Sequence, residues 1–241
     1  KSMGYVRDVF GQRHMEELIG NYGLGHVRYP TAGGNGKEFA QPMYVNSPYG
    51  ISIAHNGNLT NAKQLGNELF HAEMRHLQTD SDSEVLLNVF AHELAKQREI
   101  YPTAKNIFKA VRKTHIRCDG AYAILALITG YGIVAFRDIN GIRPLSIGIR
   151  KGKKRDEYII ASEDALFVTL GFKKMRDIDP GEAIFIDKDG NLFSEQCAQE
   201  TQKRPCIFEY VYFSRPDSKI DEISVYKARM RMGSKLAKQI K

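Results

Sequence analysis

Apolar residues recur at helical spacing through much of the first half of the chain. After Ser81, the spacing of three and four residues that is typical of an amphipathic helix gives a predicted buried stripe of Val85, Leu86, Val89, Phe90 and Leu94. The same periodicity predicts helices over residues 9–19, from Thr60 onward with Leu65, Leu69 and Ala72 inward, and over residues 103–116. The three successive helices after Thr60 fit one packed layer.

From Gly120 onward the pattern changes to short apolar runs separated by turn residues such as Asn140-Gly141 and Asp189-Gly190. Predicted strands cover residues 121–127, 133–137, 144–149, 157–161, 183–186 and 192–193, with a short helix near 164–170. This order predicts an antiparallel meander. A block of helices followed by a block of strands indicates an α+β layered fold.

The last fifty residues have a different pattern, and we predict a domain boundary near Asn191. Residues 206–213 form a β-prone aromatic run, and residues 225–240 predict a basic helix. The chain therefore divides into a first domain, residues 1–190, and a second segment, residues 191–241, whose helix carries apolar residues without evident partners.

Charge and cysteine content exclude several classes of protein. The net charge is +7, but the densest basic cluster, residues 150–155, lies between two predicted strands and is typical of a solvated hairpin tip. Three cysteines without Cys-x-x-Cys spacing predict neither a disulfide framework nor a metal site. No apolar run approaches the roughly 20 residues of a membrane span. We therefore expect no nucleic-acid partner, no membrane partner and a cytoplasmic location.

Candidate chemistry gathers in three short segments. Arg28 offers a planar guanidinium suited to a carboxylate, and Asp82 offers an anion directly after the predicted helix cap Ser81. Asn56-Gly57 follows a predicted strand, where an amide and a backbone N–H could donate to an oxyanion.

Each of these residues also has a simpler interpretation. Arg28 could form a surface ion pair, Asp82 could only stabilise a helix start, and Asn-Gly after a strand is the usual signal of a type I′ hairpin turn. Ser81 and Glu84 have the spacing of a capping box. No cysteine adjoins these segments in sequence, and neither His26 nor His55 is assigned a catalytic role.

Taken together, the motifs resemble the glutaminase domain of the amidophosphoribosyltransferase family, within the class II, N-terminal-nucleophile glutamine amidotransferases. The matching segments are residues 25–33, 45–50, 54–61, 79–84, 136–145, 179–183 and 208–218. The glucosamine-6-phosphate synthase branch shares the Arg, Asn-Gly and Asp positions, but Tyr29-Pro30-Thr31 and the aromatic run near Phe208 favour the first branch.

The resemblance implies a four-layer αββα fold with antiparallel sheets, followed by the beginning of a phosphoribosyltransferase domain. It implies that Arg28 and Thr31 bind the glutamine carboxylate, that Asp82 binds the ammonium group, and that Asn56 and Gly57 form the oxyanion hole. Tyr29 would lie on a loop that closes over glutamine. The ammonia released would react with phosphoribosyl pyrophosphate to form 5-phosphoribosylamine in purine synthesis.

The chain also departs from the family pattern. Relative to the family it begins after the N-terminal nucleophilic Cys and ends in the first transferase helix, so we expect this stretch alone to be inactive. The resemblance implies magnesium with phosphoribosyl pyrophosphate outside this stretch, no cofactor or metal within it, and a homo-oligomer, either a dimer or a tetramer. Cys206 matches an iron–sulfur ligand of some members, but we expect no cluster. A non-catalytic regulatory or nucleic-acid-binding module on the same scaffold remains the alternative, supported by the basic residues 227–232.

Overall fold

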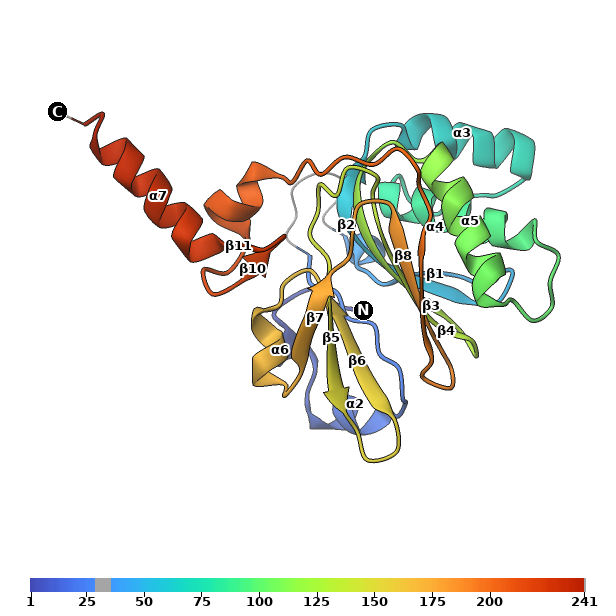
Figure 1. Cartoon of the computed structure of the whole chain (residues 1–241). Helices are drawn as coiled ribbons and strands as arrows, with labels where there is room; N and C mark the ends of the chain where they lie inside the picture. The colour runs from blue at the N-terminus through green and yellow to red at the C-terminus, as the bar shows by residue number, and fades with distance from the viewer. Residues whose placement is uncertain (29–35, 241) are drawn as a thin grey trace.

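The computed structural model describes residues 1–28 and 36–240 and contains two principal sheets (Figure 1). The larger sheet has the order β1-β2-β3-β4-β8-β9, and the smaller has the order β6-β5-β7; all neighbouring strands are antiparallel. The strands of the larger sheet are β1 (Met43–Val45), β2 (Ile51–Leu59), β3 (Gly120–Ile128), β4 (Gly132–Arg137), β8 (Glu182–Asp187) and β9 (Leu192–Gln196). Those of the smaller are β5 (Ser146–Lys151), β6 (Asp156–Ala161) and β7 (Lys173–Asp177).

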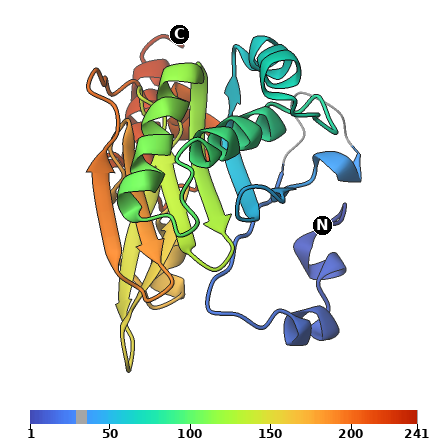
Figure 2. The same cartoon turned by 90° about the vertical axis from the view of Figure 1, so that its right-hand side faces the viewer.

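Three helices form the layer that covers one face of the larger sheet (Figures 1 and 2). They are α3 (Ala62–Glu73), α4 (Asp82–Ala95) and α5 (Ala104–Arg117), and α4 packs against both of its neighbours and against β2. Leu86 and Phe90 of α4 are fully buried in the same core as Phe136 of β4. The predicted helical layer and its stripe of apolar residues are confirmed, except that Ala72 is exposed.

The smaller sheet packs on the opposite face of the larger one. Ala135 and Ile184 of the larger sheet share a second core with Ile147 of the smaller sheet. On the outer side, Phe167 of the short helix α6 (Ala165–Thr169) lies against Gly148, where any added Cβ would be 2.9 Å from the Phe167 ring. The order is therefore helices, sheet, sheet, helix, which agrees with the predicted α+β, four-layer αββα arrangement.

Several local predictions were wrong for physical reasons. Residues 9–19 do not form one helix. Helix α1 (Val6–Val9) ends where the predicted helix begins, and α2 (Gln12–Glu17) covers only its middle; neither buries a residue, so no packing stabilises a longer helix. Ser81 does cap α4, accepting from Ser83 N, but Glu84 does not close a capping box. Its carboxylate instead accepts from the backbone N–H groups of Gln78 and Thr79.

The C-terminal segment does not form the strand predicted for residues 206–213. It runs along the β4–β5 loop, donating from Gln202, Arg204 and Cys206 N–H to loop carbonyls, and then coils into the π-helical turn η2 (Glu209–Phe213). Beta propensity depends on an available partner strand, and the pairing stops at Cys206. The hairpin β10 (Lys219–Ile220) and β11 (Ile223–Ser224) follows, and α7 (Val225–Ala237) projects away from the sheets (Figure 1).

The remaining short element is η1 (Lys37–Phe39), before β1. The domain boundary near Asn191 stays a prediction, although β9 begins just after it and pairs with β8 in the larger sheet. Within the described residues, no helix is both long enough and apolar enough to cross a membrane.

Candidate functional site

The second half of β2 has one edge that no strand covers within residues 1–28 and 36–240. β3 pairs with all nine residues of β2, whereas β1 pairs only with residues 51–53. Beyond that point, side chains meet the backbone: Gln41 Oε1 accepts from His55 N at 2.6 Å, and Asp82 Oδ2 accepts from Leu59 N at 2.9 Å. Because the backbone groups of a strand alternate between its edges, Gly57 N–H points to this same edge, between the two capped residues.

Gly57 is required by the close approach of β3. A Cβ at this position would lie 1.9 Å from the carbonyl oxygen of Ala121, which is impossible without moving the strands apart. The predicted alternative of a hairpin turn at Asn56-Gly57 is wrong, as is the expectation that the strand ends there, because both residues lie within β2 opposite Ala123 and Tyr122. The backbone donor of Gly57 is therefore fixed by the sheet.

Asn56 is held by an arginine that comes from the β4–β5 loop. Its Oδ1 accepts from Arg143 Nε at 3.1 Å and from Arg143 Nη2 at 2.7 Å. A guanidinium only donates, so these two bonds assign the oxygen of the Asn56 amide and leave Nδ2 as the donor. That Nδ2 lies 3.4 Å from Ser162 Oγ. The site thus has two donors on successive residues of one strand.

Asp82 lies at the N-terminus of α4, beside the end of β2. Besides accepting from Leu59 N, its Oδ2 is 4.0 Å from Nδ1 of His55, and its carboxylate side chain is about one-quarter exposed at 23%. The helix start favours a negative charge at this position. The carboxylate is therefore anchored and still accessible to a cation.

Two histidines close to Asn56, His55 and His26, have pKa values below the usual value for histidine. Burial lowers the pKa of His55, and the nearby negative charge of Asp82 offsets only part of this decrease. Burial also lowers the pKa of His26. His55 Nδ1 lies 3.0 Å from Ser83 Oγ, and Gln41 Nε2 donates to the same hydroxyl. This buried network fixes the strand behind Asn56.

Arg28 is half-buried and its guanidinium lies over the ring of Phe39, 5.7 Å from the centroid. The charge of Arg28 lowers the pKa of His26, after the larger effect of burial, and His26 interacts with the His55 backbone. Arg28 therefore belongs to the segment beside β2. The predicted site residues Tyr29 and Thr31 lie outside the described residues.

The three cysteines are free thiols. Burial raises the pKa of Cys118 to about 12 and that of Cys197 to about 11, so both remain protonated at neutral pH. Within residues 1–28 and 36–240, no group of three His, Cys, Asp or Glu side chains is arranged to hold a metal ion.

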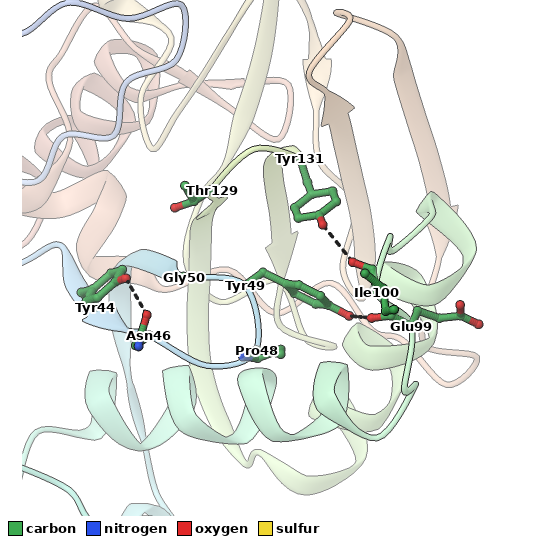
Figure 3. A pocket seen from close by; sticks show the side chains of 9 residues that line it. All are labelled: Tyr44, Asn46, Pro48, Tyr49, Gly50, Glu99, Ile100, Thr129 and Tyr131. Carbon is green, nitrogen blue, oxygen red and sulfur yellow. Dashed lines mark hydrogen bonds between the residues drawn. The ribbon is translucent and has the colours of Figure 1, made fainter.

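A large groove lies elsewhere, at the opposite end of β2 (Figure 3). It has a volume of about 740 Å³, and its tyrosine hydroxyls already have partners: Tyr49 donates to Glu99 O and Tyr131 to Ile100 O. Ile51, beside this groove, is five residues from Asn56, a separation of about 17 Å along a strand. The groove is lined by Tyr44, Asn46, Pro48, Tyr49, Gly50, Glu99, Ile100, Thr129 and Tyr131.

Sequence reasoning assigned no role to Arg143, Gln41 or Glu209. Arg143 lies 87 residues from Asn56 in the chain, and Gln41 lies 14 residues from His55. Arg143 does fall within the matching segment 136–145, and Glu209 within the segment 208–218. Contacts of such long range require the fold.

Comparison with known proteins covers the whole chain. A family profile described as "Glutamine amidotransferase domain" matches residues 34–169. The amidophosphoribosyltransferases of Pseudomonas aeruginosa and Escherichia coli are 58% and 56% identical to the chain; each alignment covers 100% of this chain and 48% of the relative. The amidophosphoribosyltransferase of Saccharomyces cerevisiae is 46% identical over the same shares. The chain spans about half the length of the curated relatives it matches.

Solved structures agree. The glutamine phosphoribosylpyrophosphate amidotransferase from B. subtilis, complexed with ADP and GMP, has a TM-score of 0.72 and 35% identity, covering 88% of this chain and 43% of that one. A structure described as the allosteric regulatory enzyme of purine biosynthesis has a TM-score of 0.73 and 36% identity, covering 89% and 43%. The fold is the α+β N-terminal-nucleophile glutaminase fold, and the chain belongs to the family of glutamine amidotransferase domains.

Proposed function

We propose that this chain forms the glutamine-binding and oxyanion-stabilising part of an amidophosphoribosyltransferase. The single observation that carries the proposal is the pair of donors on β2. Asn56 Nδ2 is identified as a donor by Arg143, and Gly57 N–H points to the uncovered edge of the strand. Two fixed donors on adjacent residues are the arrangement that stabilises the oxyanion formed when a nucleophile attacks an amide carbonyl.

Glutamine recognition follows from the charges around this pair. Arg28 would bind the α-carboxylate together with Thr31, and Asp82, anchored at the end of β2, would bind the α-ammonium group. Tyr29 would close over the bound substrate. A cysteine thiol would attack the side-chain carbonyl while its own α-amine accepts the thiol proton. The amine would return this proton to the departing nitrogen, so that the tetrahedral intermediate expels ammonia and leaves a thioester, which water then hydrolyses to glutamate.

The nucleophile would be an N-terminal cysteine of the full-length protein. The high pKa values of buried Cys118 and Cys197 make both poor nucleophiles. We propose that residues 1–241 alone do not hydrolyse glutamine.

The ammonia would displace pyrophosphate from phosphoribosyl pyrophosphate and form 5-phosphoribosylamine, the first committed step of purine synthesis. The similarity of the chain to amidophosphoribosyltransferases over its whole length supports this acceptor. Magnesium would accompany the pyrophosphate donor outside this stretch, and we propose no iron–sulfur cluster. A homo-oligomer and a cytoplasmic location complete the proposal; free thiols fit a reducing compartment.

The test is an acceptor assay with the full-length protein that contains this chain. Glutamate release from glutamine is measured with phosphoribosyl pyrophosphate, with fructose 6-phosphate, and with no acceptor. We expect pyrophosphate release to require both glutamine and phosphoribosyl pyrophosphate. Free ammonium should be able to replace glutamine in this reaction. A protein that uses fructose 6-phosphate instead belongs to the glucosamine-6-phosphate synthase type. A protein that releases no glutamate and binds nucleic acid with strong salt dependence would contradict the proposal.

A further inference from the structure

Arg143 connects the candidate oxyanion hole to the C-terminal segment of the chain. Two of its nitrogens donate to Asn56 Oδ1, and the third, Nη1, lies 3.0 Å from Glu209 Oε1. The guanidinium also lies over the ring of Phe213, 5.2 Å from the centroid. Each nitrogen and one face of this group therefore has a defined partner.

The C-terminal end of this connection is buried. Glu209 is 5% exposed, and it also accepts from Ser214 Oγ at 2.7 Å. A carboxylate in such a position needs its cation, because an unpaired buried charge is costly. Glu209 thus holds Arg143 in one orientation and prevents the guanidinium from turning to solvent.

The backbone of the β4–β5 loop is fixed as well. Arg137, which is 1% exposed, donates from Nε to the carbonyl of Arg143 at 2.7 Å and binds Asp221 of the C-terminal segment through both Nη atoms. Burial alone would raise the pKa of Asp221, but Arg137 and Lys203 lower it overall, so the pair is ionised. Asp138 accepts from the N–H groups of Asn140 and Ile142 within the same loop.

On this basis we propose that Arg143 is a positioning residue for glutamine hydrolysis. It orients the Asn56 amide so that Nδ2 is directed to the developing oxyanion, and Glu209 of the C-terminal segment keeps Arg143 in place. The inference rests on the proposed function, since it assigns Asn56 as the donor. It adds that the orientation of the Asn56 amide is fixed by Arg143, 87 positions away in the chain, and by the C-terminal segment, which lies outside the two principal sheets.

The chain offers a matched control in Arg150. Its Nε donates to Glu157 at 2.7 Å and its guanidinium lies over Phe172, 4.4 Å from the centroid, so it repeats the acid and aromatic partners of Arg143. Its Nη1 donates to Leu170 O at 2.7 Å, and none of these partners belongs to the candidate site.

The experiment is a double-mutant cycle in the full-length protein, with kcat and KM for glutamate release measured separately. Arg143→Lys keeps the charge that pairs with Glu209 but removes the fork that holds Asn56. We expect its kcat to fall roughly 10- to 100-fold, the scale of a misplaced reacting group, with KM little changed. Arg150→Lys should leave both constants unchanged.

In an Asn56→Ala background, Arg143→Lys should have no further effect, because residues that act through one contact are not additive. Glu209→Gln should lower kcat by a smaller factor, and this effect should also vanish with Asn56→Ala. Thermal melting of each variant separates misfolding from loss of positioning.

Two results would overturn the inference alone: a wild-type kcat in folded Arg143→Lys, or losses that multiply in the double variant. If Asn56→Ala itself retains full kcat, the proposed function is overturned and the inference falls with it.

Discussion

The two ends of β2 differ in a way that shows how a functional site is recognised. The end near Ile51 borders a groove of about 740 Å³, yet the hydroxyls of Tyr49 and Tyr131 are bonded to the α4–α5 connection, and Glu99 is the one charged residue among the described residues that line it. The end near Asn56 lies beside the N-terminus of α4. It instead has an uncovered strand edge, two fixed donors and an anchored carboxylate. Directed polar groups, and not the size of a cavity, distinguish the candidate site.

The largest effect is expected from Gly57→Ala. The added Cβ would lie 1.9 Å from Ala121 O, so β2 and β3 must separate; we expect a loss of about 3 kcal/mol or more in the free energy of unfolding, with loss of glutaminase activity. Gly130→Ala is the control at the groove end: its φ is also positive, at 82°, but no atom lies within 4 Å of the new Cβ. Urea denaturation should show a cost of only about 1 kcal/mol there, with activity kept. If Gly57→Ala and Gly130→Ala lost the same free energy of unfolding, the close approach of β3 at Gly57 would not be what requires a glycine there.

Asp82→Asn should act on substrate binding. Loss of a hydrogen bond to a charged group costs about 1.5–3 kcal/mol, so KM for glutamine should rise roughly 10- to 100-fold in steady-state assays, while the protein stays folded. Asp80→Asn is the matched control, because Asp80 is exposed and two residues away. An unchanged KM in the Asp82 variant would assign this carboxylate to helix capping only.

A smaller, pH-dependent effect is expected from His55. Its folded-state pKa is lowered by burial, so the unfolded chain binds more protons once the pH falls below about 6.5, and folding stability declines with acid. His55→Gln removes that proton uptake. The slope of unfolding free energy against pH should therefore flatten below pH 6.5, by up to about 1.4 kcal/mol per pH unit. Denaturant titrations at several pH values measure it, and an identical slope in the variant would contradict the expectation.

The smallest effect is expected at the groove. Tyr131→Phe removes one hydrogen bond, to Ile100 O at 2.9 Å, and should cost about 0.5–1.5 kcal/mol of stability. Neither kcat nor KM for glutamine should change. A marked change in either constant would show that this end of β2 takes part in the reaction.

The sequence predicted the layers better than the connections between them. Helix α4 and the strands β3, β4 and β8 followed from their apolar residues, because these elements lie between the layers and contribute to the two buried cores. β1 and β7 were missed: β1 has three residues, and β7 has a mostly exposed, charged sequence. Short or polar strands are defined by their partners and not by their own pattern.

The same division applies to the candidate site. Asn56, Gly57 and Asp82 could be named from motifs, but their geometry could not. Asn-Gly after a strand most often indicates a hairpin turn, and only the pairing of β2 with β3 excluded that turn. Arg143 and Glu209 depend on contacts between distant segments, and the β-prone run near Glu209 even predicted the wrong element. Long-range polar contacts are set by tertiary structure, which periodicity does not encode.

The central claim is that the Asn56 amide stabilises the oxyanion, and Asn56→Ala in the full-length protein tests it most directly. Asn46→Ala, in the groove lining, serves as the control. Removing one oxyanion donor costs roughly 10²- to 10³-fold in kcat, so we predict a fall of this size in glutamate release for the Asn56 variant, with KM for glutamine nearly unchanged. A folded Asn56→Ala protein that keeps its kcat, or that loses only affinity for glutamine, would contradict the account.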